Sequence, residues 1–89
     1  MNYDYNETSE QLYKTAISRI VASILQHNEA CLSGDAEEAK ATSREILSFA
    51  NLVGCMFDLE EDVVLVSAFK LFANFAKDKG IEIHESLPI

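Results

Sequence analysis

The sequence predicts an all-α protein, a small antiparallel three-helix bundle with an extended C-terminal tail. Three observations favour this fold. Apolar residues recur at intervals of three and four along most of the chain. Residue pairs typical of helix starts, together with glycines, divide the chain into segments at about 9–32, 36–57 and 59–79. A hydrophobic content of 48% can form a core in a single domain of 89 residues, with flexible or extended ends at 1–8 and 81–89.

The first predicted helix begins near Thr8, because Thr8 and Gln11 have the spacing of a capping box. The residues that follow form one broad apolar face, with polar residues on the other side. The apolar positions are Leu12, Tyr13, Ala16, Ile17, Ile20, Val21, Ile24 and Leu25. Gly34 suits the left-handed residue that follows a helix, so we expect the chain to turn back there.

The second predicted helix starts after Asp35, which repeats the cap spacing with Glu38. Its first half is rich in Ala and Glu, which form helices readily. Its second half is apolar on nearly every side, so we expect other elements to enclose it. Gly54 lies in this apolar half and would allow another backbone to approach closely.

The third segment begins with a further cap-like pair, Asp58 and Glu61. Val63, Val64 and Val66 are β-branched and would also suit a strand. The length of the segment and its apolar residues at helical spacing favour a helix instead, and Gly80 would end it. The spaced apolar residues are Leu65, Phe69, Phe72 and Ala76.

The tail at 81–85 alternates apolar and polar residues, as a short strand would. The predicted fold offers it no partner strand. We therefore expect the tail either to pack as an extended arm or to pair with a second copy of the chain.

Three helices of this length leave more apolar surface than a narrow core can bury. Several large apolar residues of the second and third helices are therefore candidates for a surface covered by another molecule. These candidates are Phe49, Leu52, Met56, Phe69, Phe72 and Phe75. This excess of apolar surface predicts a homodimer or higher oligomer, or a protein partner.

The chain is strongly acidic, with fifteen Asp and Glu against seven Lys and Arg and a formal charge of -8. This balance argues against direct nucleic-acid binding, which requires a basic surface. The densest charge is a candidate binding site for a basic partner, although a solvated helix start is the more common explanation of such a run. It consists of Asp58, Glu60, Glu61 and Asp62.

The cysteines and histidines do not predict a disulfide or a metal site. In a hairpin that turns near Gly34, Cys31 and Cys55 lie about 30 Å apart along the helix axis. Both are expected to be buried free thiols, as in a reducing cytoplasm. His27 and Cys31 share one helix face, but they offer only two metal ligands, with His84 in the tail.

No membrane span or secretory signal is expected, and the sequence predicts no catalytic residues and no cofactor. The serines lie inside helices and no glycine-rich phosphate loop exists, so we do not expect an enzyme. The leading hypothesis is a protein-interaction module that regulates or inhibits a larger basic partner by stoichiometric contact. A nucleic-acid-processing enzyme is one such target, since inhibitors carried by phages and plasmids often have this acidic helical profile. The alternative is a self-assembling homo-oligomer that is structural or binds a small ligand in an apolar pocket between subunits.

Overall fold

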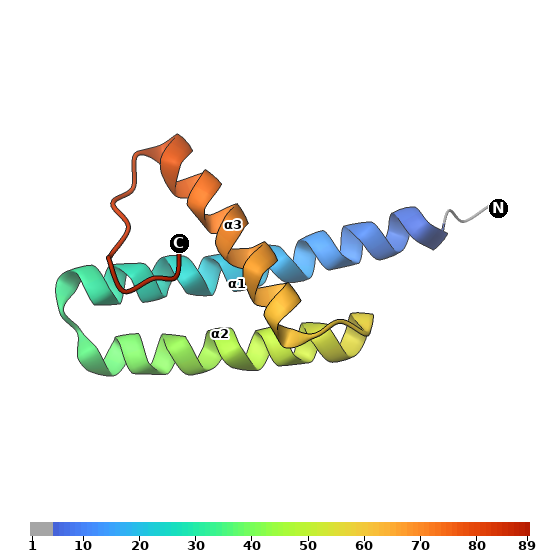
Figure 1. Ribbon diagram of the computed structural model, residues 1–89, viewed down its shortest axis with the longest axis horizontal. Helices are drawn as coiled ribbons and strands as arrows, with labels where there is room; N and C mark the ends of the chain where they lie inside the picture. Colours follow the sequence, from blue (N-terminus) through green and yellow to red (C-terminus); the bar gives the residue numbers. More distant parts are fainter. Residues whose placement is uncertain (1–4) are drawn as a thin grey trace.

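The computed structural model describes residues 5–89 and confirms the all-α three-helix bundle (Figure 1). The helices are α1 (Tyr5–Ser33), α2 (Ala36–Phe57) and α3 (Glu61–Lys79), with no strand in this part of the chain. The first two helices lie side by side and antiparallel, and α3 crosses α1 at an angle. Each helix contacts the other two.

The start of α1 differs from the expectation. The helix begins at Tyr5, so Thr8 lies inside it and is not its N-cap. The predicted loose end at 1–8 is therefore wrong for residues 5–8, and residues 1–4 lie outside the described part of the chain. The apolar periodicity, which begins at Leu12, gave no information about the turns that precede it.

The turn between α1 and α2 forms as predicted. Gly34 adopts a left-handed conformation with φ 75°. The side chain of Asp35 accepts a hydrogen bond of 3.1 Å from the backbone N–H of Glu38, so Asp35 is the N-cap of α2. The observed bounds of α2 agree with the predicted range of 36–57.

The turn between α2 and α3 uses Asp58 differently from the prediction. Asp58 does not cap α3 but ends α2, in a left-handed conformation with φ 54° and ψ 47°. The N-cap of α3 is Glu60, whose side chain makes no capping hydrogen bond. This turn folds back over Gly54, whose carbonyl accepts a hydrogen bond of 2.8 Å from the N–H of Leu59. A Cβ at Gly54 would lie 2.7 Å from the carbonyl oxygen of Leu59, which confirms the expected close approach of another backbone.

The core is built from one stripe of each helix. On α3 the stripe repeats every four residues, through Val64, Ala68, Phe72 and Ala76, and this spacing confirms the helix and excludes the strand. The two alanines leave room for α1 and α2 to approach closely. The buried residues contributed by the other elements are Ile17, Ile20, Ile24, Ile46, Ala50, Val53 and Leu87.

The C-terminal tail packs as an extended arm along the bundle and forms no strand between residues 81 and 89. Asn28 of α1 is fully buried and holds this arm. Its Nδ2 donates to the carbonyl oxygen of Glu82 at 2.8 Å, and its Oδ1 accepts from the N–H of His84 at 2.8 Å. The apolar residues of the alternating pattern, Ile81 and Ile83, pack against the core. One side-chain amide therefore replaces the partner strand that the alternation suggested.

None of the helices within residues 5–89 combines the length and the apolar character that crossing a membrane requires.

Candidate functional site

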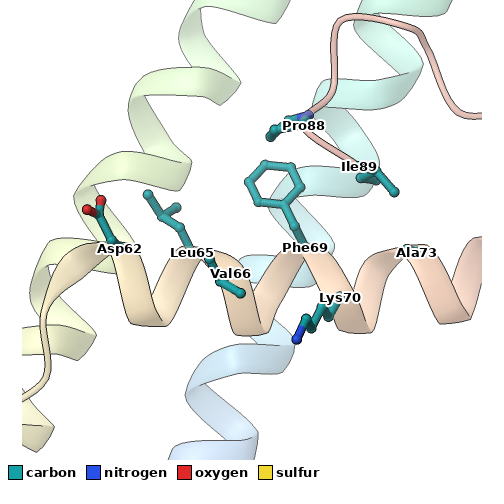
Figure 2. A pocket seen from close by; sticks show the side chains of 8 residues that line it. All are labelled: Asp62, Leu65, Val66, Phe69, Lys70, Ala73, Pro88 and Ile89. Atoms are coloured by element: carbon teal, nitrogen blue, oxygen red, sulfur yellow. The ribbon is translucent and has the colours of Figure 1, made fainter.

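A surface hollow of about 640 Å³ lies between α3 and the end of the tail (Figure 2). Its lining residues are Asp62, Leu65, Val66, Phe69, Lys70, Ala73, Pro88 and Ile89. A smaller hollow of about 300 Å³ shares Leu65, Phe69 and Pro88 with it and is completed by α1, α2 and Ser86. Because the two hollows share these walls, we treat them as one surface, the α3–tail groove.

The groove is apolar because α3 carries a second hydrophobic stripe beside its core stripe. Leu65, Phe69 and Ala73 follow at intervals of four residues and are each one position away from a core residue. All three are half-buried, which is the exposure expected at the edge of a core. Figure 2 shows the ring of Phe69 pointing from α3 toward Pro88, so a residue of the tail forms the facing wall.

One end of the α3–tail groove is acidic. Asp62, in the first turn of α3, lines the large hollow, and Lys70 is the cationic residue that lines it two turns further on. Glu61 lines a separate hollow of about 530 Å³ on α2, together with Leu52 and Cys55. Of the predicted acidic cluster, Glu61 and Asp62 therefore border hollows, whereas Asp58 and Glu60 form the exposed turn before α3.

The predicted apolar surface is only partly exposed. Leu52 and Met56 on α2 are 55% and 64% exposed, and Phe75 near the end of α3 is 38% exposed. Phe49 and Phe69 are half-buried against the core. Phe72 is fully buried and is not part of any surface, because it belongs to the α3 stripe that faces the core.

The sequence reasoning missed several residues that line the groove. Leu65 had been noted for its helical spacing only, and Val66 was considered only as a strand former. The signal in the sequence was that a second set of apolar residues on α3 follows each core residue by one position, which indicates a second apolar stripe. For Pro88 and Ile89 no local signal existed, since their position depends on the bonds that Asn28 makes to the tail.

A second cluster, of polar side chains, joins α1, α2 and the tail. His27 Nδ1 lies 2.9 Å from Thr42 Oγ1, and His27 Nε2 lies 3.7 Å from Cys31 Sγ. The hydroxyl of Ser86 lies 3.7 Å from Cys31 Sγ and 2.7 Å from Nδ1 of His84. The five residues form a continuous chain of contacts between the three elements.

The thiols of Cys31 and Cys55 are free, as predicted. Their expected burial is wrong for Cys55, which is exposed on α2 beside Asn51, while Cys31 is half-buried. Among the described residues, no group of three or more His, Cys, Asp or Glu side chains is arranged to hold a metal ion. All buried side-chain polar atoms in the same residues have hydrogen-bond partners, so the core itself presents no unused ligand.

Comparison with known proteins finds no matching family model, no similar curated protein and no similar solved structure. The function of the chain is therefore inferred from its own surfaces and side chains.

Proposed function

We propose that this chain is a protein-interaction module that regulates or inhibits a larger partner by stoichiometric contact, and that the α3–tail groove binds a basic amphipathic helix of that partner. The observation that carries the proposal is the groove itself: an open apolar surface with a carboxylate, Asp62, at one end. Concave apolar surfaces with a few polar groups at the edge are typical of binding sites.

The dimensions of the groove favour a helix as its occupant. Its lining on α3 runs from Asp62 to Ala73, which at 1.5 Å per residue corresponds to about 16 Å, or three turns of a bound helix. Two helices pack well when side-chain ridges spaced by four residues interdigitate, and Leu65, Phe69 and Ala73 form such a ridge. A peptide bound by strand addition would need the free edge of a sheet, and residues 5–89 contain no strand.

The charge of the chain favours a basic partner over a second copy of the chain. The formal charge is -8, and Asp62 lines the groove in the first turn of α3, a few residues after the exposed acidic residues Asp58 and Glu60. This field attracts Lys and Arg and accelerates their encounter with the groove. Two copies that met at this surface would bring like charges together, which weakens self-association.

Enzymes that process nucleic acids fit this description, because they present basic surfaces to phosphates. Carboxylates of this chain would occupy positions that phosphates otherwise take. The free thiols are compatible with a reducing compartment such as the cytoplasm, where such partners act.

Photo-crosslinking from α3 tests the proposal. A photoreactive amino acid is placed at Val66, which lines the groove and is 56% exposed, or at Val63, which is 47% exposed and does not line it. Crosslinking in cells that make the protein, followed by mass spectrometry, should give a basic amphipathic segment of one larger protein from position 66 only. Equal products from both positions, an acidic segment, or no product at position 66 would each contradict the proposal.

A binding measurement with the crosslinked segment, made as a synthetic peptide, provides the quantitative test. Val66→Asp should weaken binding about tenfold or more, since it places a charge on the apolar contact. Val63→Asp should leave the affinity within about twofold, because it adds the same charge outside the groove. Equal losses for both variants would show that charge alone, and not the groove, controls binding.

The alternative function, a homo-oligomer, is favoured by a different observation. Large apolar side chains outside the groove are also exposed, among them Leu12, Leu71 and Met56. Light scattering after size-exclusion chromatography, at low and high salt, separates the two proposals. A stable dimer together with crosslinks between copies at position 66 would replace the partner-binding proposal with self-assembly.

A further inference from the structure

The polar cluster that joins α1, α2 and the tail contains a nucleophile next to a base. We propose that Cys31 is a thiol-modification site, at which His27 acts as general base and a low-molecular-weight disulfide is the co-substrate. This assignment goes beyond the groove proposal and does not depend on it.

The hydrogen bonds favour one tautomer of His27. Thr42 Oγ1 lies 2.8 Å from the carbonyl oxygen of Glu38, and this contact is a hydrogen bond only if the hydroxyl donates. The hydroxyl oxygen of Thr42 is then the acceptor for Nδ1–H of His27, at 2.9 Å. The lone pair of the neutral imidazole is therefore on Nε2, which faces Cys31 Sγ at 3.7 Å.

This arrangement supplies the parts that an activated nucleophile needs. The thiol of Cys31 has a base within hydrogen-bond reach, and Thr42, which is buried, fixes the orientation of that base. The hydroxyl of Ser86 lies 3.7 Å from the sulfur. Nδ1 of His84 accepts the backbone N–H of Ser86 and lies 2.7 Å from the same hydroxyl, so the hydroxyl proton is directed to His84 and His27 is the group placed to exchange a proton with Cys31.

The exchange proceeds with a complete balance of atoms and electrons. His27 Nε2 takes the proton of the Cys31 thiol, and the resulting thiolate attacks one sulfur of the disulfide R–S–S–R. A new bond joins Cys31 Sγ to one S–R group while the S–S bond of the co-substrate breaks. The leaving thiolate R–S⁻ receives the proton from His27 and departs as R–SH. The lone pair of the Cys31 thiolate forms the new S–S bond and the electron pair of the old bond leaves with R–S⁻, so one disulfide replaces another and Cys31 ends as a mixed disulfide.

The position of Cys31 makes His27 necessary for this reaction. Cys31 lies in the last turn of α1, where the helix dipole is negative and no basic residue is present. The helix end therefore opposes a thiolate, in contrast to a cysteine at a helix N-terminus. Proton transfer to His27 is the feature of this environment that favours reaction.

Cys55 provides an internal control in the same chain. It is more exposed than Cys31, and its sulfur contacts the side-chain amide oxygen of Asn51 at 3.7 Å, which is not a base. If exposure alone controlled the reaction, Cys55 would exchange faster. The proposal predicts the opposite order.

Exchange with oxidised glutathione, measured on the full chain at neutral pH with mass spectrometry of each cysteine peptide, tests the proposal. We expect Cys31 to form the mixed disulfide about tenfold faster than Cys55, a modest share of what a positioned base contributes. In concentrated guanidinium chloride the two rates should become similar, because the folded environment of each thiol is lost. A native rate at Cys31 equal to or below that at Cys55 would overturn the proposal.

Two variants locate the cause of the difference. His27→Gln should lower the rate at Cys31 about tenfold and leave Cys55 unchanged, with the helix content checked by circular dichroism. Ser86→Ala, at an exposed position of the tail, is the control and should leave the rate at Cys31 within about twofold, since the hydroxyl proton is directed to His84 and not to the sulfur. An unchanged Cys31 rate in a folded His27→Gln protein would show that the imidazole is not the base. Should His27→Gln not fold, the ratio of the two rates in the native chain still decides the proposal.

Discussion

Hydrogen bonds hold the end of the bundle where α1 turns into α2, whereas close packing holds the opposite end, where α2 turns into α3. At the first end Asp35 caps α2 and Asn28 binds the tail through both atoms of its amide. At the second end the backbone folds directly over Gly54.

The aromatic rings of Tyr13 and Phe57 meet edge to face at the packed end, with centroids 5.2 Å apart. There the side chain of Glu60 does not cap α3. The two ends together form the groove. Packing at one end fixes where α3 starts, and hydrogen bonds at the other end place the tail opposite α3. Three pairs of substitutions test this division.

The largest effect is expected at the hydrogen-bonded end. Asn28→Ala removes the partners of the Glu82 carbonyl and the His84 N–H and should lower the free energy of unfolding by about 3 kcal/mol. Urea unfolding measures this loss, and faster exchange of the His84 amide hydrogen locates it in the tail. Asn74→Ala, at an exposed position of α3, is the matched control and should change stability by less than about 0.5 kcal/mol. Equal effects at the two positions would show that the amide does not hold the tail.

The next effect is expected at the packed end. Gly54→Ala would place a methyl group 2.7 Å from the Leu59 carbonyl oxygen and should cost about 2 kcal/mol, because the neighbouring atom is backbone and must shift. Gly34→Ala has nothing within 4 Å of its new Cβ, and it should cost about 1 kcal/mol through its left-handed φ alone. Thermal unfolding of both variants checks the order. A smaller loss at Gly54 than at Gly34 would refute the steric account of this turn.

The smallest effect is a gain in stability. Glu60 occupies the N-cap position of α3 with extended backbone angles but without a capping bond. Glu60→Ser should therefore stabilise the chain by about 0.5 to 1 kcal/mol, whereas Asp35→Ala, which removes the existing cap of α2, should cost about 1 kcal/mol. Denaturant midpoints of the two variants compare the caps directly. No gain in Glu60→Ser would mean that the turn over Gly54 does not allow a serine side chain to reach the helix N–H groups.

The helices were predictable because each carries its own local signal. Asp35 with Glu38 gave the start of α2, and Gly34 and Gly80 gave the ends of α1 and α3. The start of α3 was not predictable in detail, because Asp58 suits both the cap of one helix and the left-handed end of another. Local sequence does not decide between these roles, since the choice depends on the path of the backbone over Gly54.

The candidate site was less predictable than the fold. Of the predicted acidic cluster, Asp62 lies beside the groove and Glu61 beside a separate hollow. It was harder to predict which apolar residues of α3 are buried. Phe72 lies on the core stripe and is fully buried, whereas Phe69 lies beside that stripe and is half-buried. The facing wall of the groove comes from the tail, and its position depends on contacts between residues more than fifty positions apart.

The bonds from Asn28 to the tail also have a consequence for the order of folding. They join residues separated by 54 and 56 positions, whereas the turn between α1 and α2 closes over only a few residues. Closing a long loop costs more chain entropy and is slower than forming a helical hairpin. We therefore expect the hairpin to form early and the tail to dock last. The same segment is then the first to open in the native state, so the wall formed by Pro88 and Ile89 is the most easily detached part of the groove.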